Sequence, residues 1–190
     1  MYGLARLMAI IGGFVLSAII ILVCISVVGR RLNTLLHTDW IEGLMGRTAQ
    51  WLLDTGIGPI LGDFELVEAG TAFAIFAFIP LCQITGGHAT VDIFTSQMSD
   101  RVNRSIQVVV DIAFALVLAL IAWRLYDGML AKMRYNETTF LLQFPVWWSY
   151  LAALVPAVVA AVIGAYVALV RIGESASGRT ILKTGGEVDH

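Results

Sequence analysis

Four long stretches of the sequence are almost free of charged side chains, and this pattern constrains the fold more than any other feature. Together they hold 86 residues but only two charges, Glu68 and Asp111, whereas the other 104 residues hold 24. A helix rises about 1.5 Å per residue, so about 20 apolar residues cross a hydrocarbon core of about 30 Å. We therefore predict an all-α membrane protein with four transmembrane helices, at residues 7–28, 66–85, 105–123 and 146–170.

The composition agrees with this class and excludes others. Charged residues make up 14% of the chain, whereas soluble domains carry about 25%. The net charge of −2 gives no basic surface for nucleic acid, so we expect membrane lipid and no nucleic acid as a partner. The first apolar stretch continues to Val28, longer than a secretory signal, and should remain as an anchor. Residues 1–172 are predicted to form one four-span domain.

Two segments outside the spans have their own patterns. At residues 40–53, between the first and second spans, apolar side chains that include Trp40 and Trp51 recur at helical spacing, with Asp39 and Glu42 as a capping pair. This pattern predicts an amphipathic helix lying at the membrane interface, or alternatively a small helix packed on the protein itself. Residues 173–190 are rich in Gly, Ser and charge, which predicts a disordered tail.

Charged side chains at the span ends are the first candidates for function. Glu65 and Glu68 lie three residues apart, which predicts one helical face, and Arg104 continues through Gln107 to Asp111 on a polar stripe. A charge inside a span costs about 2.5–3.5 kcal/mol on insertion scales. Glu68 and Asp111 are therefore either ion or proton ligands or, as we favour, partners of an arginine in this chain or another. Beyond Trp123 the helical pattern continues, so the third helix should extend past the bilayer.

The last span begins with a distinctive pattern. Pro145 suits a first helical turn, and Trp147, Trp148 and Tyr150 suit a membrane interface. Two rows of small side chains follow at four-residue spacing, which predicts close contact with other helices, or alternatively an alanine-rich face toward lipid. The rows are Ala153, Ala157, Ala161 and Ala165, and Ala152, Pro156, Ala160, Gly164 and Ala168.

The sequence does not have the patterns of an enzyme or a haem anchor. The three histidines, His37, His88 and His190, all lie outside the spans, where they cannot hold a haem inside the bundle. No HExxH or GxSxG motif and no pair of intramembrane aspartates occurs, so we expect no catalysis, metal or cofactor. Polar groups do not gather in the middle of the spans, which favours a subunit that binds another membrane protein over a carrier acting alone.

A family resemblance emerges from the order of the polar motifs. Glu65 and Leu66 open the second span, and Gly87, His88, Val91 and Asp92 follow it. Glu137 and Thr138, with Leu141, Pro145, Trp147 and Tyr150, lead into the last span, and Arg30 ends the first. This order resembles the small membrane subunit of tripartite ATP-independent periplasmic (TRAP) transporters, the DctQ-like family, over about residues 5–172. The connection from Arg31 to Asp63 is longer than the family's usual short link.

The resemblance implies a small integral subunit of the bacterial inner membrane with both termini in the cytoplasm. Lys and Arg by themselves leave the orientation open, because six fall on each side. The implied partners are a large multi-span DctM-like subunit, which carries the sodium and substrate sites, and a periplasmic substrate-binding protein. The small subunit would brace the large one during uptake of an organic acid. The alternative is an adaptor of an unrelated inner-membrane complex. Candidate interface or structural residues are Arg30, Glu65, Glu68, His88, Asp92, Arg104, Asp111, Glu137, Pro145 and Trp147.

Overall fold

A computed structural model describes residues 1–37, 58, 60–85 and 100–177 of the chain. It contains four helices: α1 (Tyr2–Leu36), α3 (Asp63–Thr85), α5 (Asp100–Tyr135) and α6 (Trp147–Ser177). Each is long and apolar enough to cross a membrane, which confirms the predicted all-α fold with four spans. The predicted interfacial helix at 40–53 lies outside the described residues.

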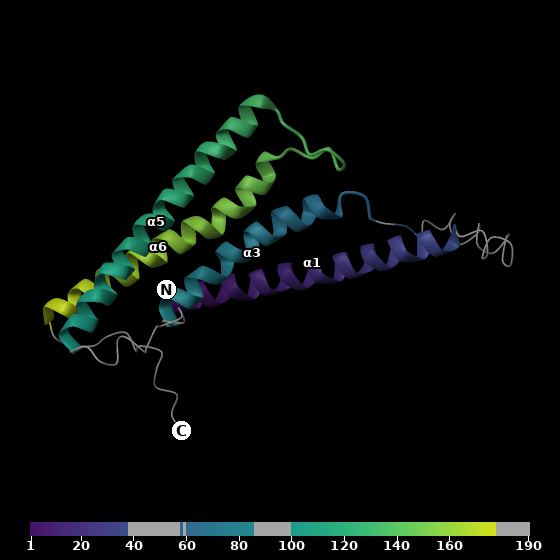
Figure 1. Cartoon of the computed structure of the whole chain (residues 1–190). Coiled ribbons are helices and arrows are strands. Elements are labelled where there is room, and N and C mark those ends of the chain that lie inside the picture. The colour runs from purple at the N-terminus through teal and green to yellow at the C-terminus, as the bar shows by residue number, and fades with distance from the viewer. Residues whose placement is uncertain (38–57, 59, 86–99, 178–190) are drawn as a thin grey trace, which may run out of the picture.

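The four helices lie side by side in the order α1, α3, α6 and α5 (Figure 1). α3 packs against α1 on one side and α6 on the other, and α5 packs against α6. We call the end of this layer where α1 begins and α6 finishes the termini end. The opposite end, where α5 is joined to α6 by residues 136–146, is the loop end. The two hairpins α1–α3 and α5–α6 spread apart toward the loop end.

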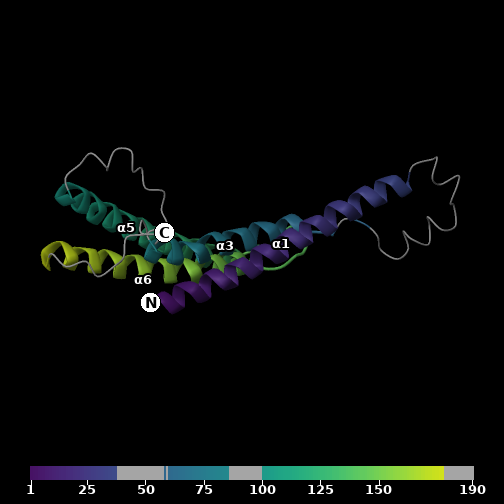
Figure 2. The same cartoon turned by 90° about the horizontal axis from the view of Figure 1, so that it is seen from below.

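The edge helices are longer than the apolar stretches that predict them. α1 has 35 residues and α5 has 36, about 50 Å each at 1.5 Å per residue, which exceeds a hydrocarbon core of about 30 Å. The predicted continuation of the third helix beyond Trp123 is confirmed, since α5 runs to Tyr135. α1 likewise projects beyond α3 at the loop end (Figure 2).

The end of the fourth helix differs from the prediction. The Gly- and Ser-rich composition predicts a disordered tail from residue 173, but α6 continues to Ser177. One reason is a local ion pair, because Arg171 Nη1 lies 3.6 Å from Glu174 Oε2 one helical turn away. Glu174 is only 4% exposed, so this turn packs against the molecule instead of lying free. Ionic and packing contacts therefore outweigh the composition here.

Small side chains create the closest helix contacts. In the row that begins with the half-buried Ala152, the residues Pro156, Ala160, Gly164 and Ala168 are buried, which confirms that this predicted row faces other helices. The second predicted row is split, because Ala153 and Ala157 are buried but Ala165 is exposed. Between α1 and α3, a Cβ added to Gly12 would lie 2.9 Å from Ala77 Cβ. In lipid such close backbone packing replaces the hydrophobic effect as the source of helix association.

Candidate functional site

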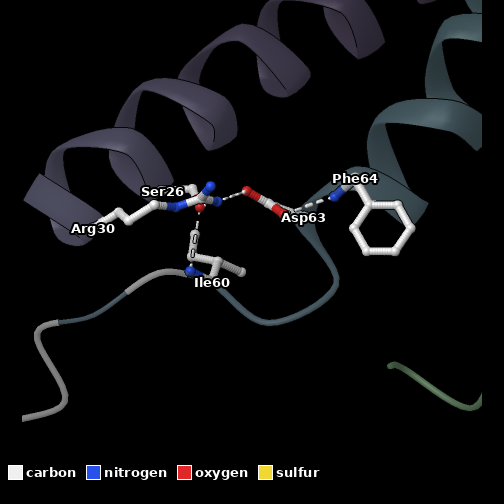
Figure 3. Close-up of polar contacts among 5 residues, drawn as sticks. All are labelled: Ser26, Arg30, Ile60, Asp63 and Phe64. Carbon is white, nitrogen blue, oxygen red and sulfur yellow. Dashed lines mark hydrogen bonds and ion pairs between the residues drawn. The ribbon is translucent and has the colours of Figure 1, made fainter. Parts of the chain in front are cut away.

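At the loop end, α1 is bound to the start of α3 by a polar cluster around Asp63 (Figure 3). The Ser26 hydroxyl, which is fully buried, donates to Asp63 Oδ2 at 2.5 Å and accepts the Ile60 backbone N–H at 3.3 Å. Arg30 Nη2 lies 3.4 Å from the same carboxylate oxygen, and the Arg30 side chain is largely exposed. The Asp63 carboxylate also accepts the Phe64 N–H at the first turn of α3. Arg30, singled out from the sequence, therefore helps hold two helices together.

The start of α3 is also bound to the α5–α6 loop through Glu65. This side chain is 6% exposed, and its two carboxylate oxygens accept the backbone N–H groups of Leu141 at 2.7 Å and Leu142 at 3.0 Å. Charge-assisted hydrogen bonds of this kind are stronger than neutral ones, and they satisfy donors that the loop would otherwise leave unpaired. Gly62 packs against Leu142 with φ +77°, a conformation that side chains other than Gly adopt at a cost.

The loop itself has a defined backbone structure. Thr138 pairs with Pro145 in an isolated β-bridge, in which Thr139 N–H donates to Phe144 O and Val146 N–H donates to Glu137 O, both at 2.9 Å. Lys132 Nζ lies 2.5 Å from Glu137 Oε2. Glu137, one of the candidate residues, therefore binds the loop to the end of α5.

The predicted position of Pro145 in the first helical turn is wrong. Pro145 lies in the bridge, two residues before α6 begins at Trp147, and its carbonyl accepts the Trp148 N–H at 3.1 Å. Because proline fixes φ and has no N–H, it suits this pairing position, where only its carbonyl is used. The prediction identified a helix start correctly but placed it two residues early.

The aromatic pair at the start of α6 borders an apolar groove. The rings of Trp147 and Trp148 meet edge to face with centroids 6.0 Å apart. Together with Phe73 on α3 and Leu151, Ala152 and Val155 on α6, they line a groove of about 480 Å³. The groove therefore lies between α3 and the first turns of α6.

At the termini end, α5 and α6 are joined by a second charged cluster. Arg171 Nε lies 3.6 Å from Asp111 Oδ2, and Arg171 Nη1 lies 3.5 Å from Gln107 Oε1. Both charged side chains are mostly buried, at 15% and 19% exposed. Asp111 thus has an arginine of this chain as its partner, whereas the favoured interpretation left open an arginine of this chain or of another. This arrangement confirms that Gln107 and Asp111 share one face of the helix.

The two glutamates of α3 have different surroundings, although their spacing predicts a common face. Glu65 is buried against the loop, whereas Glu68 is exposed and makes no ion pair with the part of the chain that the structure describes. Residues three apart differ by about 60° around a helix, and the edge of the packed surface falls between these two. Among the candidate carboxylates that the structure describes, Glu68 is therefore the exposed one without an ion pair, and it is available for contact with another chain.

Three of the candidate residues have no described side chain. His88 and Asp92 lie outside the described residues, and only the backbone of Arg104, within α5, is described. Sequence reasoning did not single out Ser26, Asp63, Lys132 or Arg171. The available signal for Ser26 was a hydroxyl within an apolar span. Arg171 was counted only as a flanking positive charge, because its approach to Asp111 requires the packed hairpin.

Between the two ends the described helix interfaces are mainly apolar. An exception is Gln83 on α3, which is 5% exposed and whose side-chain amide lies against Gly164 of α6. Neither amide atom has a hydrogen-bond partner among the described residues. Within the same residues, no three His, Cys, Asp or Glu side chains are grouped so that they could hold a metal ion.

Residues 19–174 match the family described as "Tripartite ATP-independent periplasmic transporters, DctQ component". No curated protein and no solved structure matches the chain. The matched range begins within α1 and ends three residues before the end of α6, so it includes parts or all of the four helices and both polar clusters. The chain therefore belongs to the DctQ family of TRAP transporter components, as its motif order suggests.

Proposed function

We propose that this chain is a brace for the large membrane subunit of its transporter. In this role it holds no substrate of its own and gives the large subunit a rigid neighbour during sodium-coupled uptake of an organic acid. A periplasmic binding protein supplies the substrate, and the large DctM-like subunit carries the sodium and substrate sites.

The observation that supports this role is the use of polar side chains at both ends of the layer. At the loop end, Asp63 binds α1 to α3 and Glu65 binds α3 to the α5–α6 loop. At the termini end, Arg171 binds α6 to α5. Each of these groups links helices, so their common effect is to fix the relative positions of all four. A rigid frame of this kind suits a brace, because a flexible one would move with its partner.

We further propose that the protein lies in the bacterial inner membrane with both termini in the cytoplasm. The start of α1 and the finish of α6 lie at the same end of the layer, which is consistent with both termini on one side (Figure 1). A reporter active only in the cytoplasm, fused to either terminus, should be active. The same reporter inserted after Asn136 should be silent, and activity there would contradict the orientation.

Co-expression with the large subunit tests the bracing role. The tagged chain should retain the large subunit through purification, and the purified chain by itself in liposomes should move no solute. Glu68→Leu should reduce co-purification and uptake together while leaving substrate preference unchanged, because Glu68 is exposed and lies away from any substrate site in this proposal. A changed substrate range, or solute movement by the chain alone, would overturn the proposal.

A further inference from the structure

The outward face of α5 carries charges at a depth where the neighbouring helix is apolar. α5 packs against α6 through a face that includes Leu118 and Ala122, both buried. Arg124 and Asp127 are exposed on the other side, among the exposed side chains Leu120, Trp123 and Leu130.

Three contacts establish the depth of these charges. Gly128 faces Tyr150, Leu118 lies beside Gly164, and Asp111 pairs with Arg171, so α5 and α6 run antiparallel in a fixed register. Counting along the helices from these contacts places Arg124 level with about Pro156, and Asp127 level with about Ala153.

This register places both residues level with the apolar part of α6, so the third span extends beyond its predicted end at Trp123. Trp147 and Trp148 are expected at the membrane interface, and Pro156 lies eight residues beyond Trp148, about 12 Å along the helix. Asp127, at the level of Ala153, is about 7 Å below the same tryptophans. From Trp147 to Val170 α6 carries no charged side chain, so lipid is the expected surrounding at this depth.

Lipid suits these two side chains poorly. A long arginine can extend toward the headgroups, and the Arg124 guanidinium lies 5.6 Å from the centre of the Trp123 ring. Aspartate has a short side chain that cannot reach so far. Neither residue has an ion-pair partner within the described part of the chain. Charged residues within spans face protein or water-filled space and pair with other groups.

The opposite edge of the layer differs. The outward face of α1 carries no charge from Leu7 to Val28, and Phe14, Ile20 and Ile21 are 74%, 56% and 60% exposed. That edge suits acyl chains without further partners. The two edges of the same layer therefore predict different neighbours.

We propose that the face of α5 around Arg124 and Asp127 is the docking surface for the large transport subunit. This inference rests on the proposed function. It requires a membrane helix of that subunit to present an acidic side chain to Arg124 and a cationic or hydrogen-bond-donating side chain to Asp127. Trp123 and Leu120 then fill the apolar part of the same contact.

Photo-crosslinking in the complete transporter tests the assignment without altering either charge. A benzophenone amino acid replaces Trp123 on α5 or, as a matched aromatic control on the other edge, Phe14 on α1. The expected result is a product of the two membrane subunits from position 123, in about tenfold excess over position 14, because photo-crosslinking requires direct contact and an interface excludes most other surface. Equal or greater yield from position 14, or no product from position 123 in a complex that co-purifies, would overturn the inference while leaving the bracing role intact. Absence of any co-purifying large subunit would instead overturn the proposed function.

Exchanging the two residues Arg124 and Asp127 tests whether their charges are complementary to those of the large subunit. The double variant Arg124→Asp with Asp127→Arg keeps one positive and one negative charge in the span. Each exchanged side chain now faces a partner group of its own sign, which should reduce co-purification of the large subunit about tenfold. Arg134→Asp is the control, because Arg134 is exposed on the same helix near the membrane surface, where charge is screened. Its co-purification should change less than about twofold. Unchanged co-purification of the exchanged variant would contradict the proposed charge pairing.

Discussion

α6 and α1 are almost equally hydrophobic, but they are surrounded in different ways. The most apolar 18-residue stretch has a mean hydropathy of 2.5 in α6 and 2.9 in α1. In α6, 50% of that stretch is buried inside the molecule, but in α1 only 6% is buried. The sequences differ in side-chain size, since α6 is rich in Ala and α1 in Ile, Leu and Val. Hydrophobicity thus predicts that a helix spans the membrane, and small side chains predict which helix lies inside the layer.

Arg171 lies on α6, the more buried of these two helices, and its substitution should have the largest effect on stability. Arg171→Leu leaves Asp111 and Glu174 without this cation in a mostly buried site, so we expect the free energy of unfolding to fall by about 3–5 kcal/mol. Thermal or denaturant unfolding in detergent micelles measures the loss. The double variant Arg171→Leu with Asp111→Leu should lose less than the single one. Equal losses would indicate that the ion pair contributes nothing specific.

Glu65 offers the next largest effect, at the junction of α3 with the loop. Glu65→Leu removes two charge-assisted hydrogen bonds to Leu141 and Leu142, which should cost about 2–3 kcal/mol of unfolding free energy. Glu68→Leu, one turn further along α3, is the matched control because its side chain is exposed. Hydrogen exchange of the loop amides should rise in the first variant only. A similar rise in both would argue against the Glu65 contacts.

Two adjacent glycines of α1 allow packed and open positions to be compared within a single helix. A Cβ at Gly12 would lie 2.9 Å from Ala77 Cβ, whereas a Cβ at Gly13 meets nothing within 4 Å. Gly12→Ala should therefore destabilise the chain by about 1–2 kcal/mol through forced separation of α1 and α3. Gly13→Ala should be neutral or slightly stabilising, because alanine favours helix. The reverse order in unfolding measurements would mean that α1 packs on a different face.

The outward face of α1 should give the smallest effect. Ile20→Ala removes methyl groups that lie 56% exposed, so the unfolding free energy of the isolated chain should change by less than about 0.5 kcal/mol. Lipid acyl chains replace the lost contacts almost fully, since they are as apolar as the side chain. A loss of 2 kcal/mol or more, on the scale of about 2–5 kcal/mol typical of a core truncation, would show that this face is packed against protein.

Much of the fold could be predicted, but less of the site. The four spans followed from charge-free length, and the extension of α5 beyond Trp123 followed from helical periodicity. The pairing of Asp111 with an arginine was predictable as a type of contact, because an intramembrane charge needs a partner. Its identity as Arg171, 60 residues away, required the α5–α6 register. The opposite environments of Glu65 and Glu68 likewise depend on where the loop lies, which spacing along α3 does not indicate.

By itself the sequence determined that this chain forms four membrane-crossing helices, and the physical reason is the backbone. In lipid every N–H and C=O must be paired within the protein, so a long apolar segment has little alternative to a helix. Only the tertiary structure decided which helices are central, which carboxylates hold the frame together and which charges on α5 remain outward. Those outcomes depend on close packing and polar contacts between distant residues, because lipid and apolar side chains are nearly equivalent neighbours for a hydrophobic helix.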